Sequence, residues 1–351
     1  MPNNVYINVL NFYQVHLNQR PCITEIKVYF RDIMKLIENI EDIKEPLNNS
    51  VITIGNFDGV HKGHQAIFHQ AIKKAKEIKG ISIVITFDPH PLRALGQSGP
   101  PLITRRDQKI ELIKLAKIDY LLCLPFTKEF AQTPPKDFIY NFLLARLGMK
   151  AIIVGPDTLF GKNRKGDISL LKTEGKKAGF SVLVPDWIND TKTSNERVSS
   201  TKIRKLVMDG QVKDIPEYLG RFYQIRGKVI KGRNRGGSQL GFPTANIKLH
   251  DELCPKFGVY AVEVECTKGK FSGVANIGYS PTFEDHMFTI EVHILDGFSS
   301  DIYDTRIRVN IIERLRDEKK FSDIKDLSLQ ITKDIEKTKE ILKGVMKSDH
   351  S

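Results

Sequence analysis

Short apolar runs alternate with amphipathic stretches through the first half of the chain. The runs are strand-length and recur at roughly thirty-residue intervals, over residues 51–55, 81–87, 119–126, 151–155 and 181–185. Between the first two runs, apolar residues repeat every three or four positions while lysines occupy the other face, as in a helix packed on a sheet. Strand, helix and strand in this order predict right-handed βαβ units and a parallel sheet, with ligands beyond the carboxyl ends of the strands.

The pattern changes after Arg204, where a short helix-like segment ends near Gly210 and residues 215–220 form a connection. Strand-like alternation follows, interrupted by turns with Gly, Pro or Asp, over residues 222–227, 258–264, 271–277, 288–295 and 305–312. This pattern predicts a small antiparallel β-barrel. A closing helix is predicted with Ser322 as its N-cap and with an apolar stripe formed by Ile324, Leu327, Ile331, Ile335 and Leu342.

Composition narrows the class of protein. The 351 residues are 40% apolar and 27% charged, which suits an ordinary globular protein with two domains. No apolar run can span a bilayer, and the first thirty residues lack the features of a secretory signal. The four cysteines form no C-x-x-C pair, so we expect a reduced cytoplasmic protein without a disulfide framework or a zinc site; they are Cys22, Cys123, Cys254 and Cys266.

The formal charge of +12 raises the question of nucleic-acid binding. Lysines and arginines are scattered along predicted helix faces rather than gathered in a basic arm with aromatics, so we predict no nucleic-acid partner. Positive charges do cluster beside glycines in residues 228–237, a setting that suits a phosphorylated small molecule better than a duplex.

The strongest chemical signal is the pair His61 and His64, which follows the β-branched run 51–60. The spacing H-x-G-H places both rings at one predicted helix N-terminus, where unpaired N–H groups and the helix dipole favour anions. Gly63 between them lets a phosphate approach the backbone. Two structural histidines are the alternative, but the strand before them and the helix after them favour a phosphate site.

Residues 197–204 supply a second set of phosphate donors, with three hydroxyls in a row at a predicted helix start and an arginine at each end. Simple N-capping by Ser and Thr is the alternative. Residues 155–167 resemble a P-loop, but they have five rather than four residues between the two glycines, and Asn163 stands where the metal-binding Ser or Thr belongs. We therefore exclude a P-loop.

In the second half, Thr244 and Asn246 are oxygen ligands suited to a hard cation such as Mg²⁺, although a Pro-Thr-Ala-Asn segment is also a common turn. Alternation places Glu291 with His293 on the strand face opposite Ile290, Val292 and Ile294. Glu291 is then either a barrel-lining base for a hydroxyl nucleophile or an outward, solvated glutamate, and the pattern leaves both open.

Five motifs in order resemble the bacterial bifunctional riboflavin kinase/FAD synthetase (FMN adenylyltransferase) family. They are residues 55–64 (GNFDGVHKGH), 87–91 (FDPHP), 199–204 (SSTKIR), 240–246 (LGFPTAN) and 273–278 (GVANIG), and the resemblance runs from about Met34 to the C-terminal helix. It implies a Rossmann-like α/β nucleotidyltransferase domain followed by a riboflavin kinase barrel. It also implies ATP-dependent phosphorylation of riboflavin to FMN and adenylylation of FMN to FAD, with Mg²⁺ beside the co-substrate ATP and with flavins as substrates and products.

The resemblance assigns roles to individual residues. His61 and His64 would stabilise the α-phosphate in transit, and the departing pyrophosphate would be held by Arg197, Ser200, Thr201 and Arg204. Asp157 occupies a position near the nucleotide where some relatives have Asn. Thr244 and Asn246 would bind Mg²⁺ with ATP or ADP, and Glu291 would be the base for the ribityl hydroxyl. The remaining candidates for ATP and phosphate binding are Gly55, Phe57, Gly63, Gly232, Arg235 and Gly241.

The chain departs from the family pattern on the flavin side. Residues 279–282 read Tyr-Ser-Pro-Thr in place of Thr-Arg-Pro-Thr, and residues 284–287 lack the expected glycines. The rival hypotheses are another H-x-G-H adenylyltransferase with an unrelated β domain, which the motifs after Gly220 oppose, and a basic nucleic-acid-binding protein on a degenerate enzyme fold, which a steep salt dependence would reveal.

The domain boundaries follow from these motifs. We expect an adenylyltransferase domain over residues 34–219, a kinase domain over 220–346 and a tail over 347–351. Residues 1–33 lack a sustained period and any chemical motif, so we expect them to be a dispensable extension ahead of a start at Met34. The oligomeric state stays open.

Overall fold

The computed structural model describes residues 34–186, 188, 197–230, 244–248, 252–279, 288–295 and 302–348. The expectation that residues 1–33 form a dispensable extension therefore lies outside the described residues. Among the described helices, none is long and apolar enough to cross a membrane.

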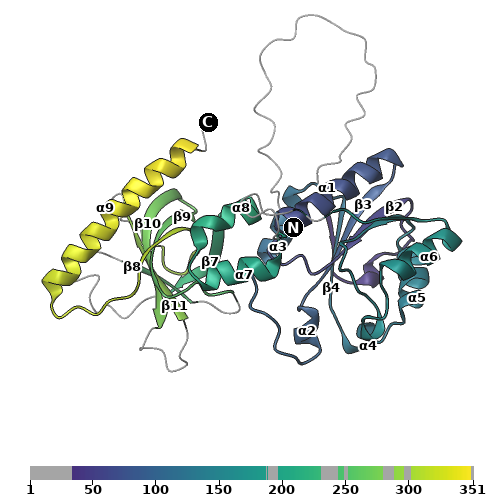
Figure 1. The fold of residues 1–351 in the computed structure, drawn as a ribbon, viewed down its shortest axis with the longest axis horizontal. Helices are drawn as coiled ribbons and strands as arrows, with labels where there is room; N and C mark the ends of the chain where they lie inside the picture. The colour runs from purple at the N-terminus through teal and green to yellow at the C-terminus, as the bar shows by residue number, and fades with distance from the viewer. Residues whose placement is uncertain are drawn as a thin grey trace, which may run out of the picture. The chain divides into compact units, whose positions relative to one another are not determined.

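The first half forms a six-stranded parallel sheet, as the spacing of its apolar runs predicts (Figure 1). The strands are β1 (Lys35–Ile37), β2 (Ser50–Ile54), β3 (Ile81–Phe87), β4 (Tyr120–Leu124), β5 (Met149–Ile153) and β6 (Ser181–Leu183). Their order is β1-β4-β3-β2-β5-β6, so the chain moves to one side of β2 with β3 and to the other with β5. The crevice beyond the carboxyl end of β2 is therefore a topological switch point, where such sheets bind ligands. The short edge strand β1 was not predicted.

Helices cover both faces of this sheet. The helical segments of this half are α1 (Lys62–Glu77), α2 (Pro91–Ala94), α3 (Arg106–Leu115), α4 (Lys128–Ala131), α5 (Pro135–Asp137), the π-helical segment η2 (Phe138–Arg146) and α6 (Ile168–Ala178), with 3-10 turns η1 (Ile40–Asp42) and η3 (Lys162–Arg164). Helices α7 (Ser200–Met208) and α8 (Ile215–Leu219) and the 3-10 turn η4 (Val212–Asp214) follow, and their buried residues share an apolar cluster with Tyr223 and Ile311 instead. α1 and α3 pack on one face through Phe68, Ala75 and Ile113. The segment η2 and α6 pack on the other through Phe138 and Leu171. The result is a three-layer α/β domain.

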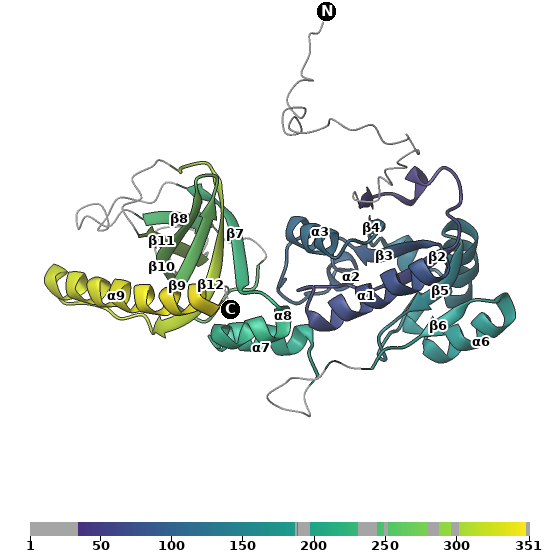
Figure 2. The same cartoon turned by 90° about the horizontal axis from the view of Figure 1, so that it is seen from above.

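The second half forms a closed antiparallel barrel, as predicted, in the order β10-β11-β8-β7-β12-β9 (Figure 2). Its strands are β7 (Tyr223–Ile230), β8 (Thr244–Lys248), β9 (Gly258–Cys266), β10 (Gly269–Tyr279), β11 (Phe288–Ile294) and β12 (Arg306–Arg316). The interior is filled by the apolar positions of the alternating segments, such as Val262, Ile290 and Val309. β8 was not predicted, because the segment after Pro243 read as a turn.

Helix α9 (Ile324–Ser348) closes the chain and contacts β9, β10 and β12. Its cap is Asp323, whose carboxylate accepts from the N–H of Asp326 at 2.8 Å, so the expectation that Ser322 caps the helix is wrong by one residue. Ile324 is 64% exposed and does not belong to the buried stripe. That stripe instead includes two polar residues, Asp334 and Thr338.

Candidate active sites

The first candidate site lies in the loop between β2 and α1. β2 is buried along its length because parallel strands in such a sheet are covered on both faces. The loop after it makes a sharp turn with positive φ at Phe57 (48°), Gly59 (84°) and Val60 (41°). Two of these are residues with side chains, which rarely adopt this conformation, and such strain is typical of ligand-binding loops. The turn places His61 at the N-cap of α1.

His61 and His64 form a stacked pair at the start of α1, with ring centroids 3.5 Å apart and an angle of 20° between the planes. The Nδ1 atom of His61 accepts a hydrogen bond from the backbone N–H of His64 at 3.3 Å. In the neutral ring the proton therefore resides on Nε2, which can donate to a ligand. Burial lowers the pKa of His61 to about 4, although Asp58 opposes this shift.

His64 is also held neutral. Its pKa lies well below the usual value, first because of burial and then because of repulsion from His61, when that ring is protonated, and from Lys109. The exposed fraction of the whole residue is intermediate, but its Nδ1 atom is inaccessible and has no hydrogen-bond partner. A buried ring nitrogen without a partner is a costly feature of the kind that functional sites retain.

The glycines of this motif leave room for the aromatic rings of neighbouring residues. A Cβ on Gly63 would lie 3.1 Å from the ring of His61, so the glycine makes room for that ring. A Cβ on Gly55 would lie 3.0 Å from the ring of Phe57. Phe57 itself is 4% exposed and packs edge-on against His64 at 5.1 Å, so it supports the histidine rather than presenting a face to a nucleotide.

Asp58 connects this loop to the second predicted phosphate motif. Its carboxylate accepts from the guanidinium of Arg204 at 2.5 Å and from the N–H groups of Ile103 and Thr104 at 3.1 and 2.9 Å. The hydroxyl of Ser200 donates to the backbone carbonyl of Asp58 at 2.8 Å. The two predicted motifs, far apart in sequence, therefore meet at one buried carboxylate.

The other predicted phosphate residues lie at the start of α7 and after β5. Arg197 and Asp157 are both exposed and form an ion pair at 3.4 Å. Thr201 is exposed in the first turn of α7, and Ser199 caps that helix by accepting from the N–H of Lys202. The structure therefore brings Ser200 and Arg204 to the histidine loop through Asp58, and it pairs Arg197 with Asp157.

Three further residues contact the histidine loop and were not predicted as site residues. His90, which lies in the FDPHP motif, has its Nε2 atom 3.2 Å from the amide nitrogen of Asn56. Arg221 donates to the backbone oxygen of Gly59 at 2.6 Å. Lys109 is 7% exposed and donates to the backbone oxygen of Asn56. No sequence signal distinguished Lys109 from the exposed Lys114 of the same helix.

The second candidate site lies on the outer face of the barrel. The alternation predicted for β11 holds, since Ile290, Val292 and Ile294 are buried in the interior. Glu291 therefore belongs to the outer face and is exposed. The register places it directly between Asn246 on β8 and Asn276 on β10, in a row across three strands.

Partial desolvation raises the pKa of Glu291, and the nearby carboxylate of Glu318 raises it further. Glu318 also accepts from the side-chain amide of Asn276 at 3.4 Å. Asn246 is 7% exposed, and its amide oxygen is a suitable ligand for a hard cation such as Mg²⁺. No group of three or more His, Cys, Asp or Glu side chains in the described part of the chain could hold a metal, so an ion here would depend on amide, hydroxyl and phosphate oxygens.

Some predicted residues cannot be placed. Gly232, Arg235 and Gly241 lie outside the described residues, as do residues 280–287 with most of the departures from the family pattern. Thr244 is described only as part of the backbone of β8, where it pairs with His293.

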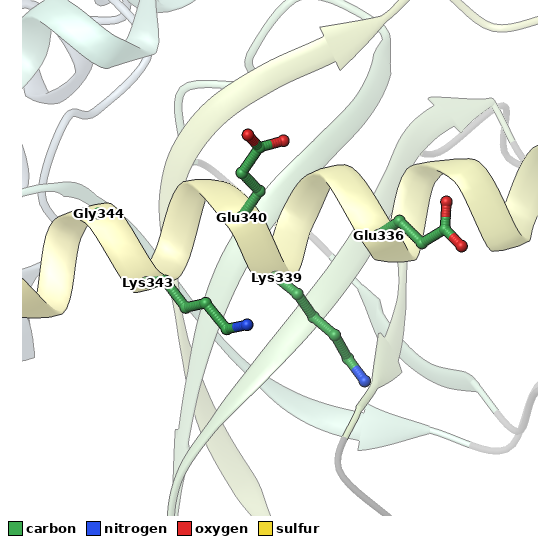
Figure 3. A pocket seen from close by; sticks show the side chains of 5 residues that line it. All are labelled: Glu336, Lys339, Glu340, Lys343 and Gly344. Atoms are coloured by element: carbon green, nitrogen blue, oxygen red, sulfur yellow. The ribbon is translucent and has the colours of Figure 1, made fainter.

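A hollow of about 450 Å³ lies along α9 and is lined by Glu336, Lys339, Glu340, Lys343 and Gly344 (Figure 3). Its side chains are the charged, outward positions of one helix, and none of the predicted site residues lines it. We therefore do not assign chemistry to it.

Comparison with known proteins matches both halves of the chain. The FAD synthetase family model matches residues 43–202, and the riboflavin kinase family model matches residues 219–342. The bifunctional riboflavin kinase/FMN adenylyltransferase of Buchnera aphidicola is 39% identical over 306 residues, which are 86% of this chain and 96% of that protein. The protein of the same name from Escherichia coli K12 is 36% identical over 307 residues, which are 86% and 96% of the two chains.

Among solved structures, the macrolide-efflux protein from Streptococcus pneumoniae is similar in fold. Its TM-score is 0.77 at 33% sequence identity, and the similarity covers 88% of this chain and 99% of that one.

Proposed function

This chain belongs to the bifunctional riboflavin kinase/FMN adenylyltransferase family, and from that premise we propose how its residues divide the two reactions. The enzyme uses ATP to convert riboflavin to FMN and FMN to FAD. We assign adenylyl transfer to residues 34–219 and the kinase step to residues 220–346. The observation that carries the first assignment is the stacked, neutral pair His61 and His64 at the N-terminus of α1.

In adenylyl transfer, an oxygen of the FMN phosphate attacks the α-phosphorus of ATP, the α–β bridging bond breaks, and pyrophosphate leaves. The attacking phosphate is already ionised, so this step needs alignment and charge stabilisation rather than a base. The Nε2–H of His61 and the N-terminus of α1 donate to the α-phosphate oxygens. Arg197, Ser200, Thr201 and Arg204 hold the pyrophosphate, and Arg204 is oriented for this by Asp58 and by the backbone oxygen of Pro101.

In the kinase step, Glu291 takes the proton of the riboflavin 5′-hydroxyl while that oxygen attacks the γ-phosphorus of ATP and ADP departs. A raised pKa makes this carboxylate a stronger base when it is ionised. Asn246 on the adjacent strand, with Thr244, is suited to bind Mg²⁺ beside the ATP phosphates. When bound, the ion would neutralise part of the phosphate charge.

Riboflavin, FMN and ATP are thus the expected partners, with no nucleic acid among them. Cys123, Cys254 and Cys266 are free thiols, which supports the proposed cytoplasmic localisation.

The first assignment is tested by removing either imidazole and separating FMN from FAD. His64→Ala and His61→Asn, which retains a side-chain oxygen able to cap α1, should abolish FAD formation while FMN accumulates. His69→Ala, at an exposed histidine on the same helix, is the matched control and should behave as wild type. Loss of FMN formation in a folded His64→Ala protein would contradict the assignment.

The second assignment is tested by Glu291→Gln, which preserves size but removes the base. Riboflavin phosphorylation should fall by roughly 10²- to 10⁴-fold, the usual contribution of general base catalysis. Adenylylation of supplied FMN should be unchanged, and Glu336→Gln on the exposed face of α9 should change neither activity. An equal loss of both activities would mean that Glu291 has a structural role.

A further inference from the structure

Lys109 is a buried lysine whose ammonium is fully engaged with the loops of the adenylylation site. It lies on α3 with 7% of its surface exposed. Its Nζ atom donates to the backbone oxygen of Asn56 at 3.3 Å, to the hydroxyl of Thr86 at 3.1 Å and to the backbone oxygen of Phe87 at 3.1 Å. These three bonds use all three protons of the ammonium and tie the loop after β2 to the end of β3.

The ammonium of Lys109 has no directly bonded carboxylate among the described residues. All three acceptors are neutral oxygens, and Asp58 and Asp88 act on its charge only from beyond ion-pair distance. Asp58 is bonded to Arg204, and Asp88 lies 3.4 Å from Arg106. Burial raises the pKa of Cys123, the remaining acidic group nearby, so its thiol stays neutral at pH 7.

A buried cation without a directly bonded counter-ion is costly, and burial accordingly lowers the pKa of Lys109, although Asp58 and Asp88 oppose this shift. The same neighbourhood contains neutral His61 and His64 and the partly buried guanidinium of Arg221. Around the histidine loop, positive charge and hydrogen-bond donors are thus in excess. The missing element is an anion, and both substrates of adenylyl transfer carry phosphates.

We propose that Lys109 is a positioning residue for adenylyl transfer, which fixes the two site loops from behind and leaves its charge to be balanced by the substrate phosphates. It does not touch the substrate, because its protons are all bonded to the protein. Its hydrogen bonds hold the carbonyls of Asn56 and Phe87 away from the ligand. Its positive charge also helps to keep the ring of His64 neutral. This inference rests on the proposed role of His61 and His64.

The test compares Lys109→Met, which removes charge and bonds at similar size, with Lys114→Met at an exposed position on the same helix. In Lys109→Met the kcat for FAD formation from FMN should fall by about 10- to 100-fold, less than the 10²–10³ lost with a directly bonded donor. Riboflavin phosphorylation should be retained, and the affinity for inorganic pyrophosphate, measured by calorimetry, should fall. Lys114→Met should leave all three unchanged.

A further measurement distinguishes positioning from simple support of the fold. With the charge of Lys109 removed, the pKa of His64 should rise toward its usual value, and the NMR titration of its ring should show this. If Lys109→Met does not fold, Lys109→Gln, which retains two donors without charge, replaces it in every assay. A normal kcat, an equal loss of both activities or an unshifted His64 titration would each overturn the inference. If Lys109→Met and His64→Ala are both fully active, the proposed adenylylation site is wrong. If Lys109→Met is fully active and His64→Ala is inactive, only the inference about Lys109 is wrong.

Discussion

Individual residues in the proposed adenylylation site are arranged to offer neutral donors, rather than charged histidines, to a phosphate. His61 is fixed in one tautomer because its Nδ1 atom caps α1, and its pKa of about 4 keeps the ring neutral across the physiological range. A neutral donor can bind a phosphate oxygen through the whole reaction without losing a proton to it. The positive charge is supplied instead by the side chains of Arg204, Arg221 and Lys109.

At the proposed kinase site, we expect two neighbouring carboxylates to determine the acid limb of the pH-rate profile. Desolvation and the charge of Glu318 both raise the pKa of Glu291, which must be ionised to act as a base. Glu318→Gln removes one of these causes, so the pKa of Glu291 should fall. Activity that is lost on acidification should then persist to lower pH, and the pH profile of riboflavin phosphorylation measures this shift.

The control for this prediction is Asp317→Asn, which removes the same charge from the next residue, where the side chain is 78% exposed. It should leave the acid limb in place. An acid limb that moves to higher pH in Glu318→Gln, or that does not move, would show that the interaction between the two carboxylates does not control the base.

The sequence identified candidate site residues that stand in short motifs. It did not identify candidates whose role depends on how their side chains pack. His61, His64, Ser200 and Arg204 stand in short motifs at predicted element ends, and such positions converge in a parallel sheet. Lys109 stands in the middle of a helix among other lysines, and only the folded structure shows that its side chain is buried. Gly63 stays a predicted site residue, and the closeness of the His61 ring to its α-carbon follows from a rotamer that no pattern encodes.

At the scale of elements, the hydrophobic pattern predicted the strands with sustained apolar runs and missed those that are short or have polar members. The runs that became β2 to β6 were recognised because a parallel sheet buries both of its faces. β1 has three residues and β8 five, with Thr244 and Asn246 as polar members, so neither gives a strong pattern. Likewise the buried stripe of α9 includes Asp334 and Thr338, which a search for apolar residues passes over.

Asp334 connects α9 to the barrel through an ion pair with Arg316. It is 5% exposed and accepts from the guanidinium of Arg316 on β12 at 2.8 Å and from the amide of Gln330 at 3.0 Å. Asp334→Ala would leave Arg316, which is 24% exposed, without its partner, so the enzyme should lose about 2 to 3 kcal/mol in unfolding free energy. Urea denaturation followed by circular dichroism measures this loss.

Two variants make this prediction specific. Glu336→Ala, at an exposed position of the same helix, should change stability by less than about 0.5 kcal/mol. Combining Asp334→Leu with Arg316→Met should recover most of the stability, because an apolar pair of similar volume often replaces a buried ion pair without loss. A double variant as unstable as Asp334→Ala would mean that the ion pair contributes more to the free energy of unfolding than an apolar pair of similar volume.

At the scale of the whole molecule, the two candidate sites share no residue. His61, His64 and Arg204 belong to the sheet domain and α7, whereas Glu291 and Asn246 belong to β11 and β8 of the barrel. FMN is the product of one site and the substrate of the other. It can therefore reach the second site through solvent, and a chain that has lost one activity should still serve a chain that has lost the other.

Mixing the two single-site variants tests this independence directly. Glu291→Gln supplied with riboflavin, ATP and Mg²⁺ should form little FAD, and His64→Ala should stop at FMN. Together they should form FAD, after a lag in which free FMN accumulates, and the lag should shorten as the Glu291→Gln concentration rises because that variant captures FMN from solution. Chromatographic separation of riboflavin, FMN and FAD over time measures both quantities. A mixture that forms FMN but no FAD, while Glu291→Gln alone still adenylylates supplied FMN at the same concentration, would show that FMN must pass between the sites of a single molecule.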